Sequence, residues 1–310
     1  MKRMIFTVTL LILLIGATPL MAGDESGGYA GSFLNFGAGA RAVALGQANS
    51  AYVNDATAPL FNPAGLAHSE GAKIIATHAL VFQDRSVNYF GGSYAFKPVT
   101  IGVGWLRFGV SDMDVWTDLG EQTGETFDDA ENAFMLAVGR TVVSTPKYSL
   151  SVGLGMKYLR HTLWDNKADG LGFDIGAIST IHMTSALRHI NFAAVIQNVG
   201  ATMTWDTESG HEDEVPISMR FGVAMAAAKF PVDLMCDIEK VENQGARLHL
   251  GTQYTWQTMA FRAGLNDDKL TAGAGFSFDL SRYDLVVDYA YAGDNISTDG
   301  THYFSFRMAF

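Results

Sequence analysis

The feature that most constrains this chain is a period-two alternation of apolar residues with small or polar ones. It begins near Lys73 and recurs to the end of the sequence. In residues 270–279, one of the clearest runs, the apolar positions are Leu270, Ala272, Ala274, Phe276 and Phe278. Because successive side chains of a strand point to opposite faces, each such run predicts a β-strand with one apolar face.

About fourteen runs of this kind follow one another. They are residues 72–80, 86–95, 100–109, 132–142, 148–161, 171–181, 190–198, 216–226, 232–239, 247–256, 259–265, 270–279, 283–292 and 301–310. Their apolar faces continue for roughly 9–11 residues, the length that a tilted strand needs to cross a bilayer. A soluble sandwich shows the same alternation, but its outer faces are more polar. The opposite faces here are rich in Gly, Ser and Ala, so the pattern favours an all-β, transmembrane antiparallel β-barrel of about 14 strands.

The N-terminus carries the features of an export signal. Lys2 and Arg3 precede an apolar run from Ile5 to Ile15, and Ala22 ends a stretch of small residues. This predicts a secretory signal peptide over residues 1–22. We therefore expect a protein of the bacterial outer membrane, with a separate segment over residues 23–70 and the barrel over residues 71–310.

Composition limits the other classes of function. Charged residues make up 17% of the chain, below the roughly 25% of an ordinary globular domain. The net charge of −11 argues against nucleic acid as a partner. Motifs of nucleophilic hydrolases, metalloproteases and phosphate-binding loops are missing from the sequence. We expect no enzymatic activity, no cofactor and no metal site.

The connections between the runs divide into two sets. Those after odd-numbered runs are mostly acidic, and the longest cover residues 110–131 and 199–214. Those after even-numbered runs are short, contain no acid, and carry the basic residues Lys97, Lys147, Arg188, Lys229 and Arg282. This segregation predicts acidic loops outside the cell and short turns in the periplasm.

The last run places four large apolar residues on one face: Phe304, Phe306, Met308 and Phe310. At the edge of a soluble sheet such a strand would promote aggregation. In a barrel it closes the sheet, and it also resembles the signal that the outer-membrane assembly machinery reads.

Residues 23–70 lack the alternation and are rich in small residues. Asn62 before Pro63 is a favourable start for a helical turn, and we expect this segment to fold into the lumen as a plug. Two stretches carry a family resemblance: Phe33-Leu34 with Gly37-Ala-Gly-Ala-Arg-Ala, and Ala51-Tyr-Val-Asn-Asp-Ala followed by Phe61-Asn-Pro-Ala-Gly-Leu-Ala. Together they resemble the N-terminal part of the PorV/PorQ family, which is related to FadL-type channels.

The resemblance implies two functions. A PorV-like protein would act in type IX secretion, binding the C-terminal domains of secreted cargo and a surface attachment complex. Its contact surface would lie on the long loops, with Trp116, Phe127, Met203 and Trp205 as apolar anchors. A FadL-like protein would be a passive channel for a hydrophobic ligand such as a fatty acid, gated by a hatch at Arg41, Asn62, Pro63, Ala64 and Gly65. A structural barrel without transport is the third possibility.

Charged residues on the inward side of the strands are the last candidates. They are Lys157, Arg220, Asp233, Asp237, Glu239, Asp284, Asp288 and Arg307. We expect them to form an ion-pair network that holds the plug, or to line a polar path that the plug gates. Arg41 of the plug is a candidate partner of Asp284 or Asp288.

Overall fold

The computed structural model describes residues 29–81, 84–184, 186–293 and 300–310. The predicted signal peptide lies outside these residues. The strands are β1 (Ala72–Leu80), β2 (Ser86–Phe96), β3 (Val99–Trp116), β4 (Gln122–Ser144), β5 (Tyr148–Leu163), β6 (Asn166–His182), β7 (Leu187–Val199), β8 (Thr202–Trp205), β9 (Glu212–Glu214), β10 (Ser218–Ala227), β11 (Val232–Val241), β12 (Ala246–Trp256), β13 (Met259–Asn266), β14 (Lys269–Asp279), β15 (Asp284–Ala292) and β16 (Thr301–Ala309).

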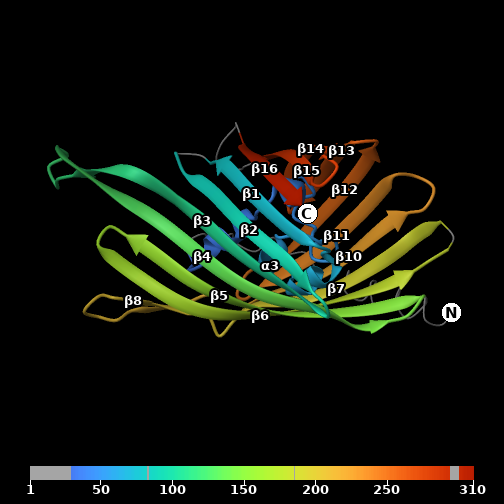
Figure 1. The fold of residues 1–310 in the computed structure, drawn as a ribbon. Helices are drawn as coiled ribbons and strands as arrows, with labels where there is room; N and C mark the ends of the chain where they lie inside the picture. The colour runs from blue at the N-terminus through green and yellow to red at the C-terminus, as the bar shows by residue number, and fades with distance from the viewer. Residues whose placement is uncertain (1–28, 82–83, 185, 294–299) are drawn as a thin grey trace.

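The strands form one closed antiparallel barrel (Figure 1). Each barrel strand pairs with its neighbours in the chain, β7 pairs with β10, and β16 returns to pair with β1. The short strands β8 and β9 form a hairpin that pairs with the outer end of β6 and takes no part in the closure. Fourteen of the sixteen strands therefore make the barrel, and the predicted fold is confirmed.

The strands on one side of the barrel are longer than the sequence predicted. The sequence predicts a loop over residues 110–131, but β3 continues to Trp116 and β4 begins at Gln122. The resulting β3–β4 hairpin projects at the left of Figure 1. Both faces of this hairpin contact water. Neither face therefore needs an apolar residue at every second position, and the period-two alternation does not extend into this part of the sequence. Residues 199–214 likewise contain the β8–β9 hairpin.

The outer face of the barrel is apolar. Large side chains that are at least one-third exposed point outward along most strands, among them Phe90, Trp105, Phe134, Phe304 and Phe306. Other exposed aromatic residues lie at the periplasmic ends of the strands, among them Tyr94, Phe96, Trp256, Tyr283 and Phe310. An apolar band between two aromatic girdles matches a barrel that faces lipid. Among the described residues, none of the helices has the length and apolarity to span a membrane.

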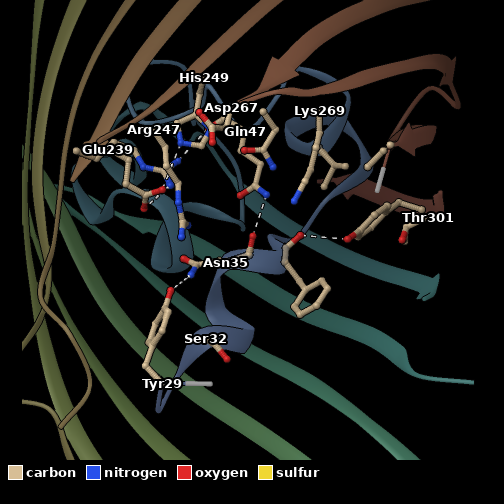
Figure 2. Close-up of a pocket in the computed structure, with 17 residues that line it drawn as sticks. Tyr29, Ser32, Asn35, Gln47, Glu239, Arg247, His249, Asp267, Lys269 and Thr301 are labelled. Atoms are coloured by element: carbon tan, nitrogen blue, oxygen red, sulfur yellow. Dashed lines mark hydrogen bonds and ion pairs between the residues drawn. The ribbon is translucent and has the colours of Figure 1, made fainter. Parts of the chain in front are cut away.

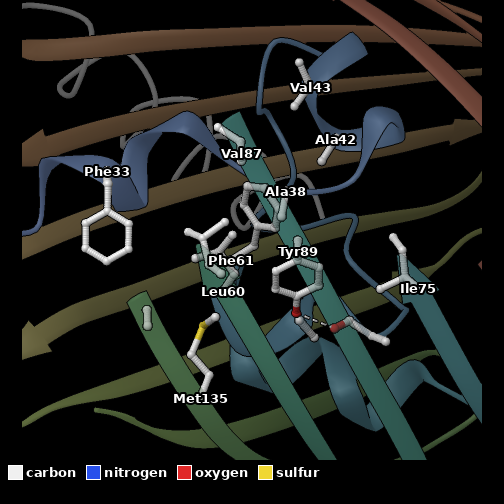
Figure 3. Close-up of a cluster of buried hydrophobic side chains, with 14 of the residues drawn as sticks. Phe33, Ala38, Ala42, Val43, Leu60, Phe61, Ile75, Val87, Tyr89 and Met135 are labelled. Carbon is white, nitrogen blue, oxygen red and sulfur yellow. Dashed lines mark hydrogen bonds between the residues drawn. The ribbon is translucent and has the colours of Figure 1, made fainter. Parts of the chain in front are cut away.

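The segment before β1 lies inside the barrel. Its helical elements are η1 (Ser32–Phe36), α2 (Ala40–Ala44), α3 (Ala58–Phe61) and η2 (Pro63–His68). Helices of four to six residues are not stable alone. They pack together with inward side chains of the wall into a buried cluster that includes Phe33, Phe61 and Tyr89 (Figure 3). We call residues 29–70 the plug.

Glycines let the plug touch the backbone of the wall. A Cβ atom added at Gly153 of β5 would overlap the backbone of Pro63 and Ala64. One added at Gly176 of β6 would overlap the amide of Asn62, and one at Gly139 of β4 would come within 2.7 Å of the Pro63 carbonyl oxygen. The Asn62-Pro63-Ala64 turn therefore packs against three neighbouring strands at positions where glycine leaves no side chain in the way.

Replacing Gly153 by Ala is expected to displace this turn at a cost of about 1–3 kcal/mol, because the added methyl group overpacks the contact. Limited proteolysis should then cleave within residues 58–68 while the barrel keeps its resistance to unfolding in detergent. Gly92→Ala is the matched control, since a Cβ there meets no atom closer than 3.7 Å. Equal proteolysis of the two variants would contradict the close fit.

Candidate functional site: the plug and the cavity above it

The Asn62-Pro63-Ala64 turn is fixed by the side chain of Asn62. Its Oδ1 accepts a hydrogen bond from the Ala64 amide at 3.0 Å, and its Nδ2 donates to the Ser50 carbonyl at 2.9 Å. Asn62 is completely buried, and Pro63 follows at the first position of η2. This is the N-cap expected from the sequence. The turn also ties η2 to the middle of the plug.

Side chains of the wall hydrogen-bond to the backbone of the plug. Ser305 accepts from the Ala40 amide at 2.7 Å, and Tyr89 donates to the Ala56 carbonyl at 2.7 Å. The other bonds of this kind involve Lys73, Thr271, Asp237, Asn191, Gln197, Arg220, His249 and Tyr303. An irregular segment leaves many backbone groups without a partner of its own. The wall supplies those partners, so the plug is bound along most of its length.

A network of ion pairs joins the plug to β13, β15 and β16. Asp288 is fully buried and binds Arg262 and Arg307, each at 2.8 Å. Arg307 also faces Asp55 of the plug at 3.7 Å, and Arg41 of the plug lies 3.3 Å from the same carboxylate. Two acids and three arginines thus alternate across the boundary between plug and wall, so each buried charge has an opposite charge beside it.

The neighbours of Asp55 displace the pKa of its carboxyl group. Burial acts to raise the pKa of Asp55, but Arg41, Arg307 and the hydrogen bonds from Thr57 outweigh it and lower the pKa to about 2. The carboxylate is therefore ionised at every physiological pH. Nearby, burial and the Asp233 carboxylate raise the pKa of Tyr52 to about 12, so its hydroxyl keeps donating to Asp233.

A second network binds the plug on its extracellular side. Arg220 of β10 pairs with Glu239 of β11 at 2.8 Å and donates to the carbonyl of Gln47 at 3.0 Å. His249 of β12 bridges the other Glu239 oxygen, at 3.2 Å, and the carbonyl of Gly46, at 3.0 Å. These contacts clamp the turn that follows α2 against the wall.

A cavity of about 420 Å³ opens beside this clamp (Figure 2). The plug contributes Tyr29, Ser32, Asn35, Phe36, Val43 and Gln47. The wall contributes Arg220, Glu239, Arg247, His249, Asn266, Asp267, Lys269, Ala292, Gly293, Thr301 and Tyr303, from the outer ends of β10–β16 and the β13–β14 turn. The cavity is therefore inside the barrel, on the extracellular side of the plug, with aromatic rings on one part of its surface and charges on another.

Several residues predicted from the sequence lie elsewhere than expected. Arg41 does not pair with Asp284 or Asp288, because Asp55 and Asn54 of the plug already hold it. Asp284 is exposed at the first residue of β15, where no lumen surrounds it. The predicted partner of Arg41 was wrong, although Arg41 and Asp288 do belong to one network through Asp55 and Arg307.

The residues predicted as surface anchors differ in their exposure. Trp116 is 59% exposed near the tip of the β3–β4 hairpin, and Phe127 stacks on Trp164 at 5.0 Å. Met203, however, is only 2% exposed, and Trp205 donates to Asp213 and packs on His161. The placement of Met203 as a surface anchor is wrong, because β8 pairs with β6 and turns this side chain inward, whereas Trp205 is half-buried and stays a prediction.

The other predicted lumen charges point inward. Lys157 is buried against Asp174 at 2.9 Å, and Asp237 accepts from the Ser50 amide at 2.9 Å. Sequence reasoning missed Arg262, His249 and Asp174, although all three occupy inward positions of their strands. It also missed Gln197 and Asn191, whose amide groups donate hydrogen bonds to the plug backbone. These side chains are neutral, so a search for inward charges does not find them. The period of the strands was the signal that could have found them.

Comparisons with known proteins agree on the fold. No protein-family model matches the chain, and neither does any curated protein sequence. The structure of the CymD monoaromatic hydrocarbon channel matches with a TM-score of 0.58 at 14% identity, over 88% of this chain and 98% of CymD. The Ralstonia pickettii toluene transporter TbuX matches with a TM-score of 0.56 at 14% identity, over the same shares of the two chains.

A Pseudomonas aeruginosa FadL homologue matches with a TM-score of 0.51 at 10% identity, over 85% of this chain and 95% of the homologue. This chain has the fold of the FadL-type outer-membrane channels. A closed barrel of this kind with a lipid-facing exterior places the protein in the bacterial outer membrane. The narrower resemblance to PorV/PorQ stays a prediction.

Asp55→Asn is expected to loosen the plug, because it leaves Arg41 and part of Arg307 without a counter-charge. A carboxyl whose pKa falls from 3.8 to about 2 stabilises the folded state by roughly 2 kcal/mol above pH 4, and this is lost as the pH falls through 2. Hydrogen exchange of residues 40–61 at pH 7 should therefore accelerate in the variant. Asp284→Asn is the control and should exchange like the wild type; equal rates in both variants would contradict the role of Asp55.

Proposed function

We propose that the protein is a passive outer-membrane channel for small molecules that combine an apolar body with an acidic group. The observation that carries the proposal is the cavity between the plug and the extracellular ends of β10–β16. Its volume of about 420 Å³ is in the range of small-molecule sites. A solute from outside reaches this cavity before it meets the plug.

The lining of the cavity favours this class of ligand. Tyr29, Phe36 and Tyr303 offer aromatic surface to an apolar body. Arg247 and Lys269 stand on the wall side, where an acidic group would find cations (Figure 2). The fold likeness to channels named for monoaromatic hydrocarbons and toluene supports a ligand of similar size.

Passage beyond the cavity needs the plug to move. Val43 and Gln47 line the cavity, and the same stretch of chain is held by Arg220 and His249. A ligand that displaces these hydrogen bonds would release the turn at Gly46. The binding site and the barrier are thus built from the same segment, which suits a channel opened by its own ligand.

The test is uptake of benzoate into proteoliposomes at pH 8, where this aromatic carboxylate crosses lipid slowly by itself. Wild-type protein should admit benzoate and exclude an uncharged sugar of similar size. Lys269→Ala should slow benzoate entry by about tenfold, the usual effect of losing one charge-assisted contact. Lys229→Ala, an exposed cation in the β10–β11 turn, is the control and should behave as wild type. Equal entry of benzoate and sugar would contradict a selective channel.

A cargo shuttle of the PorV type is the second candidate. It is supported by the β3–β4 hairpin, which carries Trp116 at 59% and Leu119 at 88% exposure among carboxylates. Exposed apolar residues of this size are typical anchors for a protein partner. Recovery of secreted proteins with the solubilised barrel, lost in a Trp116→Ala, Leu119→Ala double variant, would favour the shuttle. Uptake of benzoate without such partners would favour the channel.

A further inference from the structure

A row of polar side chains crosses the outer face of the barrel near the extracellular ends of β1–β6. The members face outward and are cross-strand neighbours in turn: His78, Asn88, Arg107, Asn132, Arg160 and Asp169. Polar residues on this face would be costly in the hydrocarbon layer. Because barrel strands are tilted by roughly 35–45°, a row of cross-strand neighbours runs obliquely to the membrane, and the depth of each member is set by its neighbours on the same strand.

For Arg107 and Asn132 this depth is set by the next row toward the periplasm. It consists of Phe90, Trp105, Phe134 and Tyr158, which are again cross-strand neighbours. Trp105 and Phe134 stack at 6.3 Å, and Phe134 and Tyr158 at 6.2 Å. Aromatic girdles sit where the hydrocarbon of a bilayer meets its headgroups. Arg107 and Asn132, two residues beyond Trp105 and Phe134 on the same strands, thus lie among the headgroups of the outer leaflet.

Most members of the polar row have a partner in the protein. His78 bonds to Asn88 at 2.8 Å. Arg160 holds Asp169 through two hydrogen bonds, of 2.7 and 3.2 Å, so its charge is neutralised.

Arg107 and the amide nitrogen of Asn132 are different. The Asn132 oxygen accepts from the Trp105 indole at 3.1 Å, which leaves its NH2 group to point elsewhere. Across the described residues, neither that NH2 group nor the Arg107 guanidinium has a hydrogen-bond partner or a carboxylate. Arg107 is nonetheless half-buried, and a partly desolvated cation without a counter-ion is unfavourable.

We propose that Arg107 and Asn132 bind the phosphate group of an anionic lipid in the outer leaflet. The two residues are direct cross-strand neighbours on β3 and β4, and paired strands lie about 4.8 Å apart. A guanidinium and an amide at this spacing can donate together to the oxygens of one phosphate.

The surroundings favour a lipid over a free ion or a protein. The aromatic row directly below supplies a surface on which acyl chains can lie while the headgroup stays at Arg107. An acidic protein would have to approach from the membrane side of the wall, because the guanidinium projects from the lipid-facing surface. The proposal concerns the outside of the barrel and does not depend on transport through it.

The experiment measures binding of purified lipid A to the detergent-solubilised full-length barrel by native mass spectrometry. Bisphosphorylated lipid A should bind the wild type, and Arg107→Gln should weaken it by about tenfold, as expected for one charge-assisted contact. Arg140→Gln is the matched control: Arg140 also faces outward on β4, but at its periplasmic end and without the Asn132 and Trp105 neighbours. It should bind like the wild type.

Each other outcome overturns the proposal. Equal binding of dephosphorylated lipid A would show that the acyl chains alone are recognised. Equal loss in Arg140→Gln would show a general effect of any lipid-facing cation. Competition by inorganic phosphate at the same concentration as the lipid would indicate a site for the free ion. Asn132→Leu, which removes the amide donors without changing the charge, should weaken binding by a few-fold, and unchanged binding would overturn the assignment of Asn132. A heat-modifiability gel confirms that each variant is folded.

Discussion

The structure depends on hydrogen bonds that run from side chains of the barrel wall to the backbone of the plug. The plug is about forty residues of mostly irregular chain enclosed by protein, and enclosed backbone groups without partners are costly. Its helices are too short to satisfy those groups themselves. Serine, threonine, asparagine, glutamine, arginine and histidine from most of the strands do so instead. The plug is consequently shaped by the wall and has no stable fold apart from it.

The same constraint explains why the lumen is polar and small. Glycines at the contact with Asn62-Pro63-Ala64 remove side chains where the two backbones touch. Elsewhere, charged groups are buried in alternating pairs, such as Asp55 between Arg41 and Arg307. Removing one partner of such a pair costs more than the pair contributes, since a buried charge is left alone. These networks therefore fix the position of the plug more than they add stability.

The outer surface follows a different rule. Where the wall faces lipid, its side chains are large and apolar, and where it rises past the headgroups the alternation ends. On β3 and β4 the change occurs between the aromatic pair Trp105 and Phe134 and the polar pair Arg107 and Asn132. Strands β3 and β4 continue beyond it and carry the acidic residues of the hairpin, so the barrel presents a taller wall on one side to the outside.

The amino-acid pattern was enough to predict the barrel, its roughly fourteen strands and the start of the Asn62 turn. Those features follow from local rules: period two, strand length against bilayer thickness, and the preference for Asn before Pro at a helical start. The partners of the inward residues, by contrast, could be found only in the folded barrel. Arg41 meets Asp55 and not Asp288, and Met203 turns inward, because strand register and the path of the plug bring together residues far apart in the chain. No local pattern records such contacts, and neutral wall residues such as Gln197 leave no charge to predict them by.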